Sequence, residues 1–257
     1  MDVKEMKAAH QVVASLAYPP RQVTRGYTDR TLHVDLSKRT IEVRPVSDYM
    51  KEYFTGGKGF DLYLMWQSIK GPIPWDSPEN GLYFSSGPLA GTPSFSGTGK
   101  CLVTGISPTT GSVMDCNVGG HFGPLVKFSG FDALEVRGKS DEWVFIVIDG
   151  DAHQVTIETA PHEPLNSYDL AEAVHHMYAE DREGLQSVSL VSAGEAALHS
   201  LIGCVNVSFY DWKRGVPRLK QAGRGGLGSV LMNKKIKGIV AKCRDNRPQW
   251  VMEVQAP

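Results

Sequence analysis

The sequence contains few cysteines, and their spacing differs from that of common metal sites. The four cysteines are Cys101, Cys116, Cys204 and Cys243, and no two of them have the C-x-x-C spacing that holds zinc or an iron–sulfur cluster. So few cysteines in a chain of this length also exclude a short disulfide scaffold. We therefore expect no complete cluster to be held by this chain alone.

The sequence also lacks a charge excess and a long apolar run. Its 27 basic and 28 acidic residues are interspersed, so no basic stripe favours a nucleic-acid partner. No run approaches the ~20 apolar residues of a membrane span. Residues 1–22 lack the charged-then-apolar order of a signal peptide. These absences predict a cytoplasmic protein with no membrane span.

The pattern of apolar residues predicts one large domain. Residues 1–23 lack a clear period and are interpreted as an N-terminal arm, 24–245 as the domain, and 246–257 as a C-terminal tail. Alternating residues predict a hairpin over 31–45, and further strands are expected at several places, including 143–150, 188–194, 200–205 and 237–242. Helices are expected at 60–69, 167–181 and 229–234. Because strands dominate, the predicted class is α+β with a few flanking helices.

Three glycine-rich loops carry the functional signal. Glycine lets backbone N–H groups approach a ligand, and neighbouring lysine or arginine supplies charge for phosphate. Each loop alone could equally serve a turn or bulge, but three together favour a large anionic cofactor. The loops are Gly97-Thr98-Gly99-Lys100-Cys101, residues 117–124 and residues 220–228.

Two nucleotide-binding motifs are nearly present, and we reject both. Residues 94–101 resemble a P-loop but lack its first glycine and its magnesium-binding hydroxyl. Gly223-x-Gly225-x-x-Gly228 matches a dinucleotide fingerprint, but it follows a polar stretch at 218–221 that does not look like a strand. Too little chain also remains after it for a βαβ unit. A nucleotide-binding enzyme is therefore the third hypothesis.

Taken in order, the loops and several shorter motifs resemble the N-terminal, cofactor-binding domain of the tungsten-containing aldehyde ferredoxin oxidoreductase family. The similarity runs from about residue 26 to 243. The motifs that carry it are Tyr-Phe-Thr-Gly-Gly-Lys-Gly at 53–59, Ser-Ser-Gly-Pro-Leu-Ala-Gly-Thr at 85–92, Thr-Gly-Ile-Ser-Pro at 104–108, residues 117–124, Lys-Phe-Ser-Gly-Phe-Asp at 127–132, 222–227 and Lys-Lys-Ile-Lys at 234–237. Their order and spacing together are specific.

The resemblance implies a saddle-like β-sheet on which a bis-pyranopterin cofactor sits, with tungsten (less expected, molybdenum) and a magnesium ion shared by two phosphates. Lys100 stands where the family usually has an arginine near the pterin. By position in the motifs, cofactor-binding residues are Lys100, Asn117, Gly119, Gly120, Lys220, Gln221, Ala222, Gly223 and Arg224, with magnesium contacts from the backbone of Asn117 and Gln221. Lys220 likewise replaces an arginine, and lysine keeps the charge but not the bidentate fork.

The family's later domains, which carry four cysteines for a [4Fe-4S] cluster and the residues around the metal, have no counterpart in this sequence. The leading hypothesis is thus a cofactor-binding subunit that is inactive alone. A larger partner chain would bring the cluster and substrate pocket, and a ferredoxin-like acceptor would take electrons. The substrate would be an aldehyde or a related carbonyl or acyl compound. The alternative is a non-catalytic assembly module, and a homo-oligomer stays open.

Three further residue groups are interpreted conservatively. His121 could face the cofactor or be a structural histidine of a tight loop. Cys101 and Cys116 flank the glycine loops, but we interpret them as small buried hydrophobic residues rather than metal ligands. His175 and His176, near Glu172, are interpreted as part of a solvated helix face.

Overall fold

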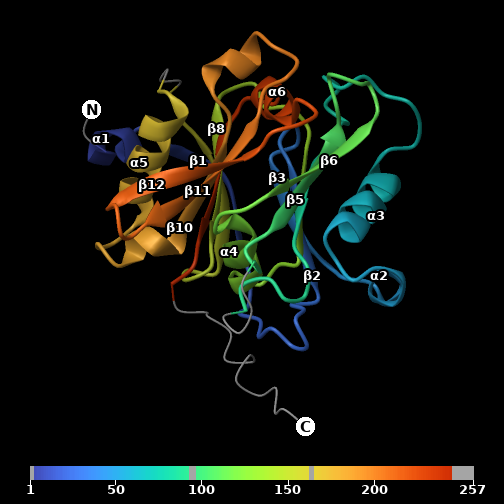
Figure 1. Cartoon of the computed structure of the whole chain (residues 1–257), viewed down its shortest axis with the longest axis horizontal. Helices are drawn as coiled ribbons and strands as arrows, with labels where there is room; N and C mark the ends of the chain where they lie inside the picture. Colours follow the sequence, from blue (N-terminus) through green and yellow to red (C-terminus); the bar gives the residue numbers. More distant parts are fainter. Residues whose placement is uncertain (1–2, 93–96, 162–164, 245–257) are drawn as a thin grey trace.

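The computed structural model describes residues 3–92, 97–161 and 165–244. The predicted tail at 246–257 lies outside the described residues, as do residues 94–96 of the P-loop-like stretch. In the described part, two mixed sheets and six α-helices form the chain, which confirms the predicted α+β class (Figure 1). No helix in this part is long and apolar enough to cross a membrane.

The strands form two sheets. The six-stranded sheet has the order β3 (Thr40–Pro45), β2 (Arg30–Asp35), β7 (Ala133–Arg137), β4 (Leu82–Ser85), β5 (Cys101–Ile106), β6 (Val113–Val118). The seven-stranded sheet has the order β1 (Gln11–Ala17), β9 (Gln154–Thr159), β8 (Val144–Asp149), β13 (Ile236–Lys242), β10 (Val188–Ser192), β11 (Val205–Asp211), β12 (Val216–Ala222). Most neighbouring strands are antiparallel, but β2 pairs with β7 and β13 with β8 in parallel.

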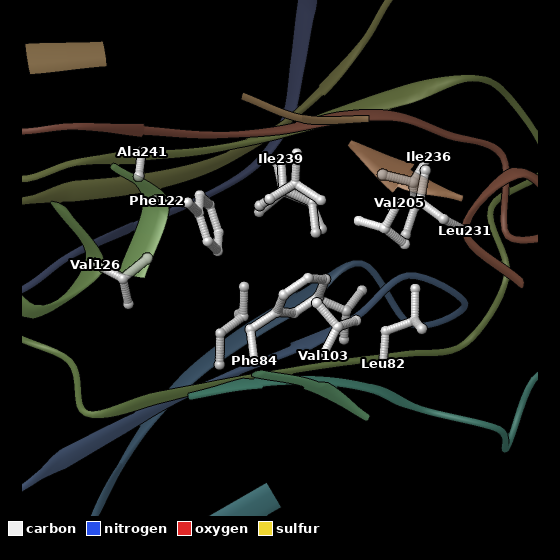
Figure 2. Packing of buried hydrophobic residues seen from close by; sticks show 14 of the residues in the cluster. Leu82, Phe84, Val103, Phe122, Val126, Val205, Leu231, Ile236, Ile239 and Ala241 are labelled. Carbon is white, nitrogen blue, oxygen red and sulfur yellow. The ribbon is translucent and has the colours of Figure 1, made fainter. Parts of the chain in front are cut away.

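The two sheets pack face to face over one large apolar core. Side chains of β4 and β5, including Leu82, Phe84 and Val103, face Val205 of β11 and Ile236 and Ile239 of β13 across the core (Figure 2). The edge strands of the two sheets also meet, because β6 contacts β12 and β1 contacts β3. This pairing of edges places the ends of β6 and β12 side by side.

Helices fill the ends of this arrangement and cover its outer faces. α4 (Phe122–Phe128) and α6 (Leu227–Asn233) insert apolar side chains into the core between the sheets. α5 (Ser167–Tyr178) packs on the outer face of the seven-stranded sheet, with α1 (Val3–Ala8) beside it. α2 (Asp48–Tyr53) and α3 (Lys58–Ser68) cover the outer face of the other sheet. The central strands are therefore buried on both faces.

The segment predicted to be an N-terminal arm contributes to the larger sheet. Its residues 11–17 form β1, which pairs antiparallel with β9 from Gln11 opposite Thr159 to Ala17 opposite Gln154. α1 is attached through Glu158, whose carboxylate accepts hydrogen bonds from Lys7 at 2.6 Å and from Tyr178 at 3.0 Å. Burial would raise the pKa of Glu158, but its hydrogen bonds with His10 and Lys7 outweigh burial and lower it to about 2.

Three local predictions were wrong. The strand expected at 200–205 begins only at Val205, since residues 200–204 form a loop. Residues 218–221, interpreted as a polar stretch, lie in strand β12, so the Gly223 fingerprint does follow a strand. The dinucleotide motif is still excluded, because β10 and β11 separate β12 from β13 and the alternating antiparallel pairs make β12 and β13 antiparallel.

The third error concerns His175, which is fully buried rather than part of a solvated face. Its ring nitrogens lie 2.8 Å from the carbonyl oxygen of Leu185 and 2.9 Å from Oγ of Ser208. Burial lowers the pKa of His175 to about 4, although the hydrogen bond to Leu185 opposes this shift. His175 therefore joins α5 to the sheet as a neutral side chain, and only His176 is exposed.

Candidate functional site

The fold brings the three glycine-rich loops together where the edge strands of the two sheets meet. Cys101, next to Lys100, is opposite Val118 in the β5–β6 pair, which places Lys100 beside Gly119. Across the gap between the sheets, a Cβ atom built on Gly119 would lie 3.7 Å from Cγ of Lys220. A Cβ on Gly99 would lie 2.9 Å from the carbonyl oxygen of Gly120. Loops far apart in sequence thus share one surface.

Five glycines of these loops fall into two groups. In the first group, packing or backbone conformation requires glycine. Gly120 has a φ of +104°, and a Cβ there would lie 2.8 Å from Val207. Gly226, with a φ of +67°, leaves no room for a Cβ beside the carbonyl oxygen of Leu201, and Gly225 leaves none beside Met114. These three glycines are explained by the fold alone.

Gly119 and Gly223 form the second group, and the protein itself does not require glycine at either. Neither has a φ in the left-handed region. A Cβ on Gly223 would meet no atom within 4 Å, and one on Gly119 would meet only Lys220 at 3.7 Å, an ordinary contact distance. Backbone left bare beside open space is what a closely approaching ligand needs.

Exposed cations surround these two glycines. Lys100, Lys220 and Arg224 are all exposed, and no described residue forms an ion pair with any of them. The Nζ of Lys220 lies 5.5 Å from the centre of the Phe209 ring. Cations without an internal counter-charge suit an anionic ligand such as a phosphate.

The remaining predicted site residues present backbone or amide groups at the same edges. Asn117 on β6 and Gln221 on β12 are exposed, and Nε2 of Gln221 donates to Oδ1 of Asn206 at 3.4 Å. Ala222 is fully buried against the core, so only its main chain is placed to contact a ligand. Asn117 and Gln221 thus lie on the edge strands of two different sheets, and backbone carbonyl oxygens are among the hard donors that magnesium prefers.

The two nearby cysteines are buried. Cys101 packs in the inter-sheet core, where burial raises the pKa of its thiol. Sγ of Cys116 donates to the carbonyl oxygen of Arg224 at 3.0 Å, and burial raises its pKa as well. This hydrogen bond ties the third glycine loop to β6.

His121 lies at the start of α4, beside the same loops. Its ring is half-buried and stands 5.8 Å from the ring of Phe209, centre to centre. With Gly99 and Thr98 it lines a hollow of about 390 Å³ that continues along α4. The position allows contact with a ligand on the loops as well as a structural role.

Sequence reasoning assigned no role to Lys58, although its motif was noted. Lys58 begins α3, and its Nζ lies 2.6 Å from Oδ1 of Asp115 on β6. Asp115 and Asn117 point to the same side of β6 because side chains alternate along a strand. The glycine turn at 56–59 therefore reaches the edge that carries Asn117.

A match to a known protein family accounts for this arrangement. The model of the family described as "Aldehyde ferredoxin oxidoreductase, N-terminal domain" matches residues 31–243. The chain belongs to the aldehyde ferredoxin oxidoreductase family. All three glycine loops lie within the matched range, so the shared surface belongs to the N-terminal domain of these oxidoreductases.

Relatives of this aldehyde ferredoxin oxidoreductase domain include several tungsten enzymes. The tungsten-containing aldehyde ferredoxin oxidoreductase of Pyrococcus horikoshii is 33% identical over 84% of this chain. The aliphatic sulfonate oxidoreductase, WOR-like subunit, of Pyrococcus furiosus is 24% identical over 84% of it. The chain spans about a third of the length of these relatives: 33% of the first and 34% of the second.

A solved structure shares the fold. The active site complex BamBC of benzoyl coenzyme A reductase, in complex with 1,5-dienoyl-CoA, matches with a TM-score of 0.70 and 27% identity. The match covers 84% of this chain and 31% of that chain. The aldehyde ferredoxin oxidoreductase domain thus occurs as one part of larger assemblies with different reactions.

The residues of this site fit the tungsten pterin cofactor that the family implies. The open backbone at Gly119 and Gly223 and the exposed cations Lys100, Lys220 and Arg224 match a ligand that is large, flat and phosphate-bearing. No group of three or more His, Cys, Asp or Glu side chains able to hold a metal occurs among the described residues. A metal bound through the sulfurs of its own cofactor needs no such group.

Proposed function

We propose that this chain is the cofactor-binding subunit of a tungsten bis-pyranopterin oxidoreductase. The observation that carries the proposal is the meeting of three glycine loops, with two glycines that the protein does not require, among exposed cations. When bound, the cofactor would supply two-electron metal redox chemistry. The chain's own part is to orient the pterins and neutralise their phosphates.

Each predicted residue has a defined task in this proposal. Lys100 lies beside the pterin, and the open backbone of Gly119 admits one phosphate group, with Gly120 shaping the turn that follows it. Lys220, Gly223 and Arg224 hold the other phosphate, together with the main chain of Ala222. The backbone carbonyls of Asn117 and Gln221 would hold a magnesium ion that neutralises part of the phosphate charge. The two residues come from different sheets, which supports a site shared by two loops.

The rest of the enzyme comes from elsewhere in the proposal. The chain spans about a third of the length of its relatives. In this proposal the [4Fe-4S] cluster and the substrate pocket lie on a larger partner chain. A ferredoxin-type protein accepts the electrons. The substrate is an aldehyde or a related carbonyl or acyl compound, since the relatives include enzymes named for aldehydes and for glyceraldehyde-3-phosphate.

The test is purification of the tagged chain from its own organism, followed by metal analysis of the intact complex. We expect tungsten or molybdenum together with extractable pterin. Lys100→Ala and Lys220→Ala should reduce both, whereas Lys213→Ala, at the turn opposite the site end of β12, should not. A wild-type complex without either metal would refute the proposal.

The same variants separate the alternative, a non-catalytic assembly module. If the complex forms but metal content and activity are unchanged in Lys100→Ala and Lys220→Ala, the loops serve assembly alone. Replacement of each lysine by arginine provides a further control, since arginine restores charge and adds a bidentate fork. These variants should retain the cofactor if the loops bind phosphate.

A further inference from the structure

The outer side of α3 carries a second surface that the proposed cofactor site does not use. Two adjoining hollows, of about 430 and 780 Å³, share Leu62 and Trp66 of α3. Aromatic residues of α2 and α3 line the smaller one, and the larger one lies between α3, residues 69–73 and the start of β6. We call the two together the α3 groove.

The α3 groove is apolar and open to solvent. Trp66 is 75% exposed, Tyr49 52% and Val113 51%. Among the residues that line the groove, Lys70 is the single charged one. Tryptophan and tyrosine are among the side chains most enriched at the energetic centres of interfaces.

The groove and the cofactor site share strand β6. Val113 lines the groove at the start of the strand, and Asn117 lies at its other end. Side chains alternate, and Asp115 between them pairs with Lys58 of α3, so all three point to the α3 side. Four strand steps separate Val113 from Asn117, which is ~14 Å.

A single partner can therefore cover both. A standard interface buries ~800 Å² on each partner, a patch roughly 30 Å across. A chain that closes over a cofactor at Asn117 approaches the β6 edge, and a patch of this width can include Val113, which lines the same hollow as Trp66. A second copy of this domain would bring another glycine-loop site but none of the parts that the family members carry in their remaining two thirds.

We propose that the α3 groove is the docking site for the larger partner chain that completes the oxidoreductase, which inserts an apolar segment beside Trp66. This inference rests on the proposed function, because it takes the partner from it. It adds the surface and the chemistry of the contact. The lining has Lys70 as its single charged residue, so the inserted segment should carry few charges. Burying an unpaired charge there would cost more free energy than the apolar contact contributes.

The experiment places a photo-crosslinking amino acid at position 66 of the tagged chain, expressed in its own organism. Position 168 is the matched control, since Tyr168 is 62% exposed on α5, outside the groove. Crosslinked peptides are identified by mass spectrometry. We expect position 66 to crosslink to a chain that carries cluster-spaced cysteines, and position 168 not to crosslink to it. Crosslinking of position 66 to a second copy of this chain, or to nothing, overturns the inference.

A binding measurement makes the test quantitative. Trp66→Glu should weaken the affinity of the purified partner at least ~10-fold, as for a central interface residue, and Tyr168→Glu should leave it unchanged. Both residues are exposed, so both variants should fold, which circular dichroism checks. An unchanged affinity in Trp66→Glu refutes the docking site.

Metal content of the wild-type complex distinguishes the two proposals. A complex with tungsten pterin but no crosslink from position 66 refutes the docking site and leaves the proposed function intact. A complex without the cofactor refutes the proposed function, whatever position 66 contacts.

Discussion

Adding a single methyl group at Gly119 or Gly223 should weaken cofactor binding without destabilising the fold. Gly223→Ala places its Cβ where no protein atom lies within 4 Å, and Gly119→Ala places it 3.7 Å from Lys220. Neither position needs a positive φ. The matched control is Gly226→Ala in the same loop region, where φ is +67° and the carbonyl oxygen of Leu201 occupies the space.

The free energy of unfolding should rise in Gly119→Ala and Gly223→Ala and fall in Gly226→Ala. Alanine at a compatible glycine position stabilises a protein by ~0.4–1 kcal/mol, because it restricts the unfolded chain. For a chain of this size that is a rise in Tm of ~1–4 °C. At Gly226, left-handed strain and steric overlap should together cost at least ~2 kcal/mol.

The affinity for the cofactor should fall in Gly119→Ala and Gly223→Ala, although these variants are expected to be more stable. If the methyl group keeps one phosphate oxygen from a backbone N–H donor, the loss is ~1.5–3 kcal/mol, or roughly 10- to 100-fold in affinity. Thermal unfolding of the isolated chain gives the first quantity. Tungsten and pterin content of the native complex gives the second.

One result would refute the reasoning. If Gly119→Ala and Gly223→Ala both retain wild-type amounts of tungsten, no ligand approaches the backbone at these positions. A marked fall in Tm in either variant would show instead that the protein requires glycine there.

Three further predictions concern the scaffold. The pKa of His175 is about 4 in the folded protein and near 6.5 in the unfolded chain, so its contribution to the free energy of unfolding should be fully present above pH 6.5 and fall by about 3 kcal/mol toward pH 4, as urea unfolding measures. His199→Gln, at an exposed histidine that does not contribute to this pKa shift, should not alter the slope. Lys127→Met should destabilise the domain by ~3–5 kcal/mol, because the buried carboxylate of Asp132 loses the ammonium group 2.5 Å away. The double variant Lys127→Met, Asp132→Asn should recover part of this loss, since it removes the unpaired charge. Phe84→Ala should lower the free energy of unfolding by ~3–5 kcal/mol in the same assay, since the Phe84 ring fills space between the sheets. A decrease of less than ~1 kcal/mol would show that the core is loosely packed there.

The sequence predicted the central strands well for a physical reason. Strands such as β8 and β13 have covered faces on both sides, so they form nearly continuous apolar runs. β12 is an edge strand on which Pro217 and Ala222 are buried and most other residues are exposed. Its composition therefore resembles a loop, and only its pairing with β11 identifies it as a strand.

The sequence predicted the individual loops of the site, but not which residues of different loops lie next to one another. Glycine and lysine beside one another indicated an anion-binding surface, and the order of the motifs indicated the family. Which glycines serve the fold and which face open space depends on neighbours distant in sequence, such as Val207 beside Gly120. The burial of His175 was equally hidden, because its partners Leu185 and Ser208 come from other elements.

The meeting of β6 and β12 has a consequence for how this cofactor surface could be tuned. Its two halves belong to different sheets whose edges meet, so the relative position of the two glycine-bearing edges depends on how the sheets pack on the apolar layer between them. Residues such as Phe84 and Ile239 lie in that layer, on opposite sheets. A change of one methylene there should therefore shift Gly119 relative to Lys220, although neither residue touches the changed side chain.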